Sequence, residues 1–175
     1  MSKKKEIGLF FGSFNPIHIG HLILANYIIE HTSMNELWFI VSPQNPFKKN
    51  QSLLPEIQRL AMVNRSIEDD FRFRASNIEF GLPKPSYTSD TLAHLTEKYP
   101  DYKFSLIMGE DNLTNLHKWK NADFLVNNYD IYVYPRPHAK PGKFENPSRI
   151  HILDAPLIEI SASFIRNSIK EKKRC

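Results

Sequence analysis

The stretch IGLFFGSFNPIHIGHLILANYIIEH, residues 7–31, decides the fold. Its first five residues form a short apolar run typical of a buried strand, and the glycine, asparagine and proline that follow favour a tight loop. After the loop, apolar side chains recur at the spacing of a helix. These side chains are Ile19, Leu22, Ile23, Tyr27 and Ile28. The chain therefore begins with a strand, a loop and a helix.

The same alternation continues to the end of the chain. Strands are expected at residues 36–42, 71–80 (one or two), 103–108, 130–134 and 150–153, and helices at 55–68, 88–99, 122–126 and 163–173. Alternating strands and helices predict an α/β fold, a Rossmann-like doubly wound parallel sheet with helices on both faces. We expect a single domain over residues 1–175, with flexible tails at 1–5 and 171–175.

Composition narrows the class of protein but does not identify it. The formal net charge is +4 and the pI about 9.1, yet many cations lie in two terminal runs, Lys3–Lys5 and Lys170–Arg174. Such a balance suits a nucleic-acid-binding module or an enzyme with phosphate ligands equally. The only cysteine is Cys175, which excludes an internal disulfide and a cysteine metal site. The apolar stretches of the chain are too short to span a bilayer, so we expect a cytoplasmic protein without membrane contact.

The first loop contains the residues that indicate a chemical function most clearly. It has neither the lysine of a Walker loop nor the three glycines of a dinucleotide fingerprint, which weakens a kinase or dehydrogenase interpretation. Instead His18 and His21 stand three apart at the start of a helix, where free N–H groups attract phosphate. Gly20 between them leaves room for close approach. The alternative is that both histidines merely cap a surface helix.

Two motifs resemble those of a known superfamily. Gly12-Ser13-Phe14-Asn15-Pro16, followed by His18-x-Gly20-His21, is similar to the signature of nucleotidyltransferases related to class I aminoacyl-tRNA synthetases. Near the other end, Ile160-Ser-Ala-Ser-Phe-Ile-Arg166 resembles their second motif. Asn15 stands where aspartate is common and Ser163 where threonine is common, so the fine geometry is open at both positions.

Further segments extend the resemblance to bacterial nicotinate-nucleotide adenylyltransferases over nearly the whole chain. They are residues 42–48, 59–62, 86–92 and 108–113, together with Trp119. The family implies transfer of an adenylyl group from ATP to nicotinate mononucleotide, giving nicotinate adenine dinucleotide and pyrophosphate in NAD biosynthesis. Mg²⁺ is expected to arrive on the ATP phosphates, because no carboxylate cluster has metal-ligand spacing.

Site residues follow from the same resemblance. The implied catalytic residues are His18, His21 and Arg166. The implied ATP-binding residues are Gly12, Ser13, Phe14, Asn15, Gly20, Gly109, Asp111, Ile160, Ser161 and Ser163. The implied acceptor-binding residues are Lys48, Thr88 and Trp119.

Several of these residues also have an ordinary structural explanation. Trp119 is placed to stack on a pyridine ring, but a tryptophan is more often part of a core. Thr88 begins a helix whose N–H groups suit the nicotinate carboxylate, yet it is also a plausible N-cap. Asp111 suits a ribose hydroxyl or a helix cap equally, and exposed lysines such as Lys48 are commonly just solvated.

Other functions stay open at this stage. Nicotinamide mononucleotide or phosphopantetheine are alternative acceptors for the same adenylyl transfer. A basic nucleic-acid-binding module explains the charge but not the two motifs, so we expect no nucleic-acid partner. The sequence leaves open whether the chain forms a homo-oligomer.

Overall fold

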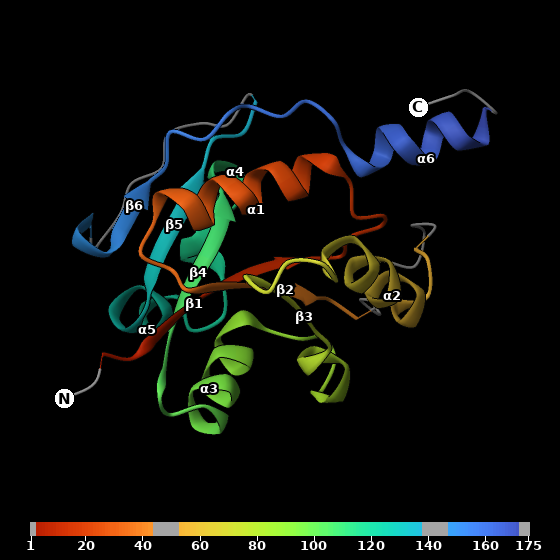
Figure 1. Cartoon of the computed structure of the whole chain (residues 1–175). Helices are drawn as coiled ribbons and strands as arrows, with labels where there is room; N and C mark the ends of the chain where they lie inside the picture. Colours follow the sequence, from red (N-terminus) through yellow and green to blue (C-terminus); the bar gives the residue numbers. More distant parts are fainter. Residues whose placement is uncertain (1–2, 44–52, 138–146, 172–175) are drawn as a thin grey trace.

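The computed structural model describes residues 3–43, 53–137 and 147–171. Its centre is a parallel six-stranded sheet in the order β3-β2-β1-β4-β5-β6 (Figure 1). The strands are β1 Lys5–Gly12, β2 Glu36–Val41, β3 Phe73–Ser76, β4 Tyr102–Gly109, β5 Asp130–Tyr134 and β6 Ile150–Ile152. This is the predicted Rossmann-like α/β fold.

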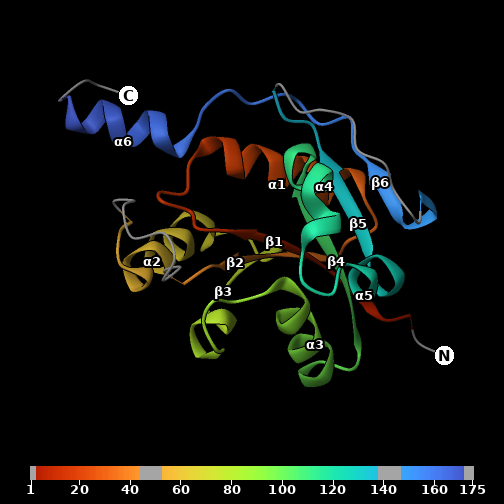
Figure 2. The same cartoon turned by 180° about the vertical axis from the view of Figure 1, so that it is seen from behind.

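Helices cover both faces of the sheet (Figures 1 and 2). The α-helices are α1 Ile19–His31, α2 Glu56–Ile67, α3 Thr88–Lys98, α4 Glu110–Asn115, α5 Ala122–Asn128 and α6 Ala162–Lys170. Three short 3₁₀ helices are η1 Ile78–Gly81, η2 Leu116–Lys118 and η3 Pro147–Arg149. Within the described ranges, no helix is both long and apolar enough to cross a membrane.

Alternate residues of the central strands supply two separate cores. Trp38 and Ile40 of β2 pack with the cluster that contains Leu92 of α3 and Leu125 of α5. Their neighbours in β2, such as Phe39, pack instead with α1 and α2. Because successive side chains of a strand point to opposite faces, one buried apolar strand holds helices on both sides.

The strand order reverses between β1 and β4, which are neighbours in space although β2 and β3 lie between them in sequence. Chains leaving these two strands turn to opposite faces of the sheet, which opens a crevice at their carboxyl ends. The loop after β1, the start of α1 and the start of α6 all lie at this end of the molecule (Figures 1 and 2). The topology therefore gathers both sequence motifs at one edge.

The segment 71–80, expected to hold one or two strands, holds one short strand, because the chain turns into η1 at Ile78. Two other features differ from expectation. The buried face of α1 contains Leu24, Ala25 and Ile28, while Ile19 and Ile23 are exposed. Lys5, within the expected N-terminal tail, is the first residue of β1 and pairs with Tyr102.

Candidate active site

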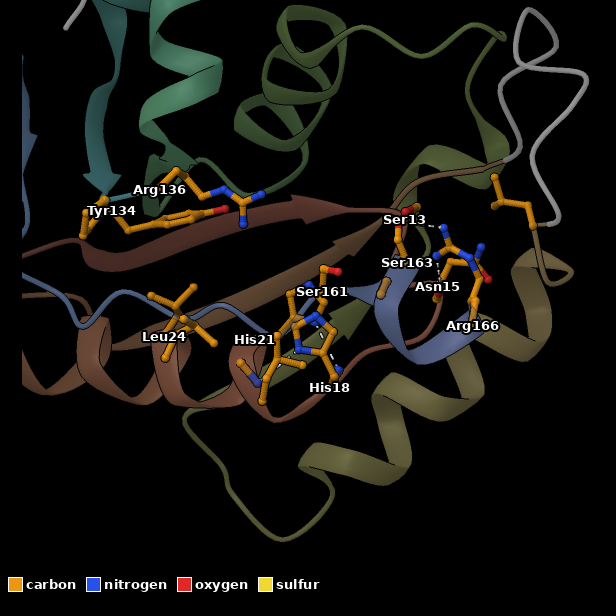
Figure 3. Close-up of a pocket in the computed structure, with 16 residues that line it drawn as sticks. Ser13, Asn15, His18, His21, Leu24, Tyr134, Arg136, Ser161, Ser163 and Arg166 are labelled. Atoms are coloured by element: carbon orange, nitrogen blue, oxygen red, sulfur yellow. Dashed lines mark hydrogen bonds between the residues drawn. The ribbon is translucent and has the colours of Figure 1, made fainter. Parts of the chain in front are cut away.

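A cavity of about 300 Å³ lies at the carboxyl end of the sheet, between the loop after β1 and the start of α6 (Figure 3). Both sequence motifs contribute to its lining, although they are far apart in the chain. The expected site residues among its lining are Ser13, Asn15, His18, Gly20, His21, Ile160, Ser161, Ser163 and Arg166. The structure thus brings nine of the expected nucleotide residues to one cavity.

His18 and His21 form a reciprocal cap at the start of α1. The Gly20 N–H donates to Nδ1 of His18, and the His18 N–H donates to Nδ1 of His21, both at 3.1 Å. The two rings stack with their centroids 3.8 Å apart. Because both Nδ1 atoms accept, the proton of each neutral imidazole is on Nε2. The capping role is therefore real, but it leaves an N–H donor on each ring.

The surroundings of the pair keep it uncharged. Burial lowers the pKa of the His21 imidazole to about 3, and repulsion from His18 when it is protonated, and from Arg136, acts in the same direction. Burial, and then the charge of Arg136, also lowers the pKa of His18. Phe14 contributes to this burial, since its ring meets that of His21 edge-on at 5.0 Å. Both rings are neutral donors at physiological pH.

The loop after β1 is fixed by contacts from distant parts of the chain. Phe14 adopts a left-handed backbone with φ of 48° while its side chain stays buried in the core. Asn15 is also buried, and its Oδ1 accepts the Leu54 N–H at 3.1 Å. The Asn15 carbonyl accepts from Nη1 of Arg166 at 2.6 Å. Arg166 therefore joins the second motif directly to the first, as Figure 3 shows.

The second motif begins helix α6. Ser161 is its N-cap, and the Ser161 hydroxyl accepts the Phe164 N–H at 3.1 Å. Arg166 also donates to the Ser163 hydroxyl at 3.2 Å. A guanidinium that bonds to protein through two nitrogens is already oriented before any ligand arrives, which reduces the entropy lost on binding an anion.

Sequence reasoning missed two polar residues of this cavity, Tyr134 and Arg136. Both stand at the carboxyl end of β5, and that position is the signal that identifies them. Arg136 Nε lies 3.7 Å from Oδ1 of Asp111, and the Arg136 N–H donates to Glu110. Arg136 adds a second guanidinium beside the histidine pair. The other unpredicted lining residues are Leu24, Leu53, Pro135, Ile158 and Ala162.

Four expected residues, Gly12, Phe14, Gly109 and Asp111, are not among those that line the cavity. A Cβ on Gly12 would lie 3.0 Å from the Phe14 ring, and one on Gly109 would lie 2.6 Å from Asp111 Oδ1. Asp111 is the second residue of α4, whose N-cap is Gly109. The capping explanation of Asp111 is therefore wrong, and its observed partner is Arg136.

A second cavity of about 340 Å³ is lined by Thr88 and Trp119, two of the expected acceptor residues. Its remaining lining is Ser86, Tyr87, Lys118 and Lys120. Tyr87 is the N-cap of α3, so Thr88 is the first helical residue and not the cap. The Lys120 ammonium lies 4.6 Å from the centre of the Tyr87 ring. Lys48 lies outside the described residues.

The core-packing explanation of Trp119 is confirmed, because the residue packs against the core cluster beneath the sheet, and it also borders the second cavity. In the part of the chain that the structure describes, no group of three or more histidine, cysteine or acidic side chains is arranged to hold a metal ion.

Comparison with known proteins places the chain in a family. A family model described as cytidylyltransferase-like matches residues 9–168. The chain is 55% identical over 170 residues to a Flavobacterium johnsoniae protein named "Probable nicotinate-nucleotide adenylyltransferase", and the match covers 96% of this chain and 88% of that protein. A Cytophaga hutchinsonii protein of the same name is 54% identical over 168 residues, with the same coverage.

Solved structures agree on the fold. A Plasmodium falciparum nicotinic acid mononucleotide adenylyltransferase, complexed with NaAD, superposes with a TM-score of 0.77 at 20% identity. The match covers 97% of this chain and 86% of that one. The family model and the sequence relatives lead to one assignment. The chain belongs to the cytidylyltransferase-like family and, within it, to the nicotinate-nucleotide adenylyltransferases.

Proposed function

We propose that this chain transfers the adenylyl group of ATP to the phosphate of nicotinate mononucleotide, giving nicotinate adenine dinucleotide and pyrophosphate. The observation that carries the proposal is the pair of cavities. One is lined by two imidazole donors and two guanidinium groups, and the other by a tryptophan and the start of α3. Donors and cations suit a triphosphate, whereas an aromatic ring beside a helix N-terminus suits a pyridine carboxylate.

The reaction needs positioning and charge stabilisation rather than a covalent nucleophile. An oxygen of the acceptor phosphate forms a bond to the α-phosphorus of ATP. The bond from that phosphorus to the bridging oxygen breaks, and pyrophosphate leaves with the electron pair. The Nε2–H groups of His18 and His21 donate to phosphate oxygens on which charge builds up, while Arg136 and Arg166 balance the charge of the leaving group.

The second cavity supports nicotinate as the acceptor's base. Thr88 begins α3, and the first N–H groups of a helix have no partner within the helix, so they favour an anion. Lys118 and Lys120 add positive charge to the rim. The Ser86 hydroxyl is buried and has no hydrogen-bond partner among the described residues. A carboxylate gains from these groups more than a neutral amide does.

Mg²⁺ would enter this site as its complex with ATP, held chiefly by the phosphates and water. It would neutralise part of the negative charge that develops on the pyrophosphate. We place the reaction in the cytoplasm, because a lone cysteine suits a reducing compartment.

The experiment is pyrophosphate release from ATP and Mg²⁺ with nicotinate mononucleotide, nicotinamide mononucleotide or phosphopantetheine offered separately. The product is identified by its mass. Strong preference for nicotinate mononucleotide is the expected result. Preference for either other acceptor would reject the proposed acceptor cavity, and no release with any of the three would reject adenylyl transfer altogether.

A further inference from the structure

Arg59 of α2 is completely buried yet lines neither cavity. Its Nη1 donates to the carbonyl oxygens of Ser13 at 2.6 Å and of Ser42 at 2.8 Å, and its Nε donates to Leu54 at 2.8 Å. A buried guanidinium is costly unless its N–H groups are used. Here Nε and Nη1 tie two points of the connection between β2 and α2 to the loop after β1, which contains Ser13 and borders the nucleotide cavity.

Ser42 is the next residue that connects separate parts of the chain. It is the first residue after β2, and its N–H donates to the Gly12 carbonyl at 2.9 Å. Its own carbonyl accepts from Arg59. Burial raises the pKa of the Glu79 carboxyl, and the nearby Ser42 hydroxyl opposes that rise. One small residue therefore contacts the nucleotide loop on one side and a buried acid on the other.

Glu79 continues the connection to the acceptor cavity. Only 3% of its surface is exposed, and its Oε2 accepts from the Thr91 hydroxyl at 2.7 Å. Thr91 lies in the first turn of α3, and its N–H and hydroxyl both reach the Tyr87 carbonyl. Tyr87 and the adjacent Thr88 line the acceptor cavity. The hydrogen bonds of Arg59 and Thr91, together with the proximity of Ser42 to Glu79, thus link the two cavities.

We propose that Arg59, Ser42, Glu79 and Thr91 are positioning residues that hold the start of α3 at a fixed place relative to the loop after β1. This inference rests on the proposed function, in which one cavity holds ATP and the other the acceptor. In-line transfer requires the acceptor oxygen close to the α-phosphorus, and a misplacement of about 1 Å can cost about 100-fold in rate. None of the four residues needs to touch either substrate.

Two substitutions break the chain at different points with little change in volume. Ser42→Ala removes the hydroxyl and keeps the backbone bonds to Gly12 and Arg59, and Thr91→Val removes the donor to Glu79. Each is expected to lower kcat about tenfold while each KM changes less than about threefold. The double variant should have the kcat of the worse single variant, because a chain already broken loses little from a second break. The decreases in Tm of the two single variants should instead add in the double variant.

Binding gives a second measurement that does not depend on turnover. The dinucleotide product spans both cavities, so its Kd should rise about tenfold in either variant, whereas the Kd of ATP alone or of nicotinate mononucleotide alone should stay within about twofold. Glu79→Gln has the same shape and can bond to both hydroxyls, so it should retain near-normal kcat, while Glu79→Leu should match the double variant.

Thr96→Val is the matched control. Thr96 lies on the same helix, and its hydroxyl is 2.9 Å from that of Tyr129, away from Glu79. It should lose stability without losing kcat. The inference is overturned if the double variant keeps wild-type kcat and product affinity. It is also overturned if the kcat losses of the single variants multiply and Thr96→Val loses kcat in proportion to its loss in Tm. A wild-type chain inactive with nicotinate mononucleotide would overturn the proposed function instead.

Discussion

His21 shows how one side chain serves both folding and chemistry. Its Nδ1 completes the cap of α1, and its Nε2–H remains available to a phosphate oxygen. We predict that His21→Ala folds but loses about 100-fold or more in kcat, the scale of removing a transition-state donor. Steady-state kinetics and thermal unfolding check this, with the exposed His94→Ala as control. Near-normal turnover would remove His21 from the mechanism.

The same residue makes stability depend on pH. The pKa of folded His21 is lowered to about 3, below the value of about 6.5 for an unfolded histidine. Between these values the unfolded chain binds the proton that the folded chain does not. The neutral His21 ring therefore makes its full contribution to the free energy of unfolding above about pH 6.5. That contribution is lost as the pH falls toward 3, by at most about 1.4 kcal/mol per pH unit.

His21→Gln separates this effect from other acid-sensitive groups. Glutamine at the third helical position still accepts the N-cap N–H but does not titrate. Denaturant unfolding from pH 7 to 4 should show a shallower loss of stability in His21→Gln than in the wild type. Equal slopes would mean that the pKa of His21 is not depressed.

Gly20 is constrained by its neighbours. A Cβ there would lie 2.7 Å from Cγ2 of Ile158 and 2.9 Å from the His18 ring. We predict that Gly20→Ala displaces the His18 ring and lowers kcat/KM for ATP at least about tenfold. Gly81→Ala is the control, since nothing lies within 4 Å of the added methyl group. If kcat/KM for ATP is the same in both variants, the crowding at Gly20 has no functional consequence.

Among the elements, the start of α3 and the residues around Trp119 together form the cavity that we propose for the acceptor. Removal of the Trp119 ring should weaken stacking on the pyridine base but leave the nucleotide cavity intact. We predict that Trp119→Ala raises the KM of nicotinate mononucleotide about tenfold or more and leaves the KM of ATP unchanged. Kinetics with each substrate varied in turn measure this. Equal damage to both constants would point to lost core packing, because Trp119 also contacts the core.

Element positions were predictable where the signal is local. Pro55 marks the start of α2, and the apolar run of β2 marks a strand buried on both faces. The buried face of α1 was not predictable, because apolar side chains occur all round this helix. The 3₁₀ turn at Ile78 was missed for a related reason, since an apolar residue there also suits a strand.

At the scale of the whole molecule, strand order decides which loops meet. The sequence predicts a parallel sheet with ligands at its carboxyl ends, and its two motifs indicate the nucleotide residues. It does not give the order β3-β2-β1-β4-β5-β6, which brings Arg136 after β5 to the cavity that holds His18. The buried link from Arg59 to Thr91 depends on tertiary packing in the same way, and no periodicity reveals it.

The most direct test of adenylyl transfer follows the label from ATP. ATP labelled at the α-phosphorus, and in parallel at the γ-phosphorus, is incubated with the chain, Mg²⁺ and nicotinate mononucleotide. We expect the α label in nicotinate adenine dinucleotide and the γ label in pyrophosphate, both only when the acceptor is present. An α label that stays in AMP or ATP, or a γ label on the acceptor, would contradict adenylyl transfer.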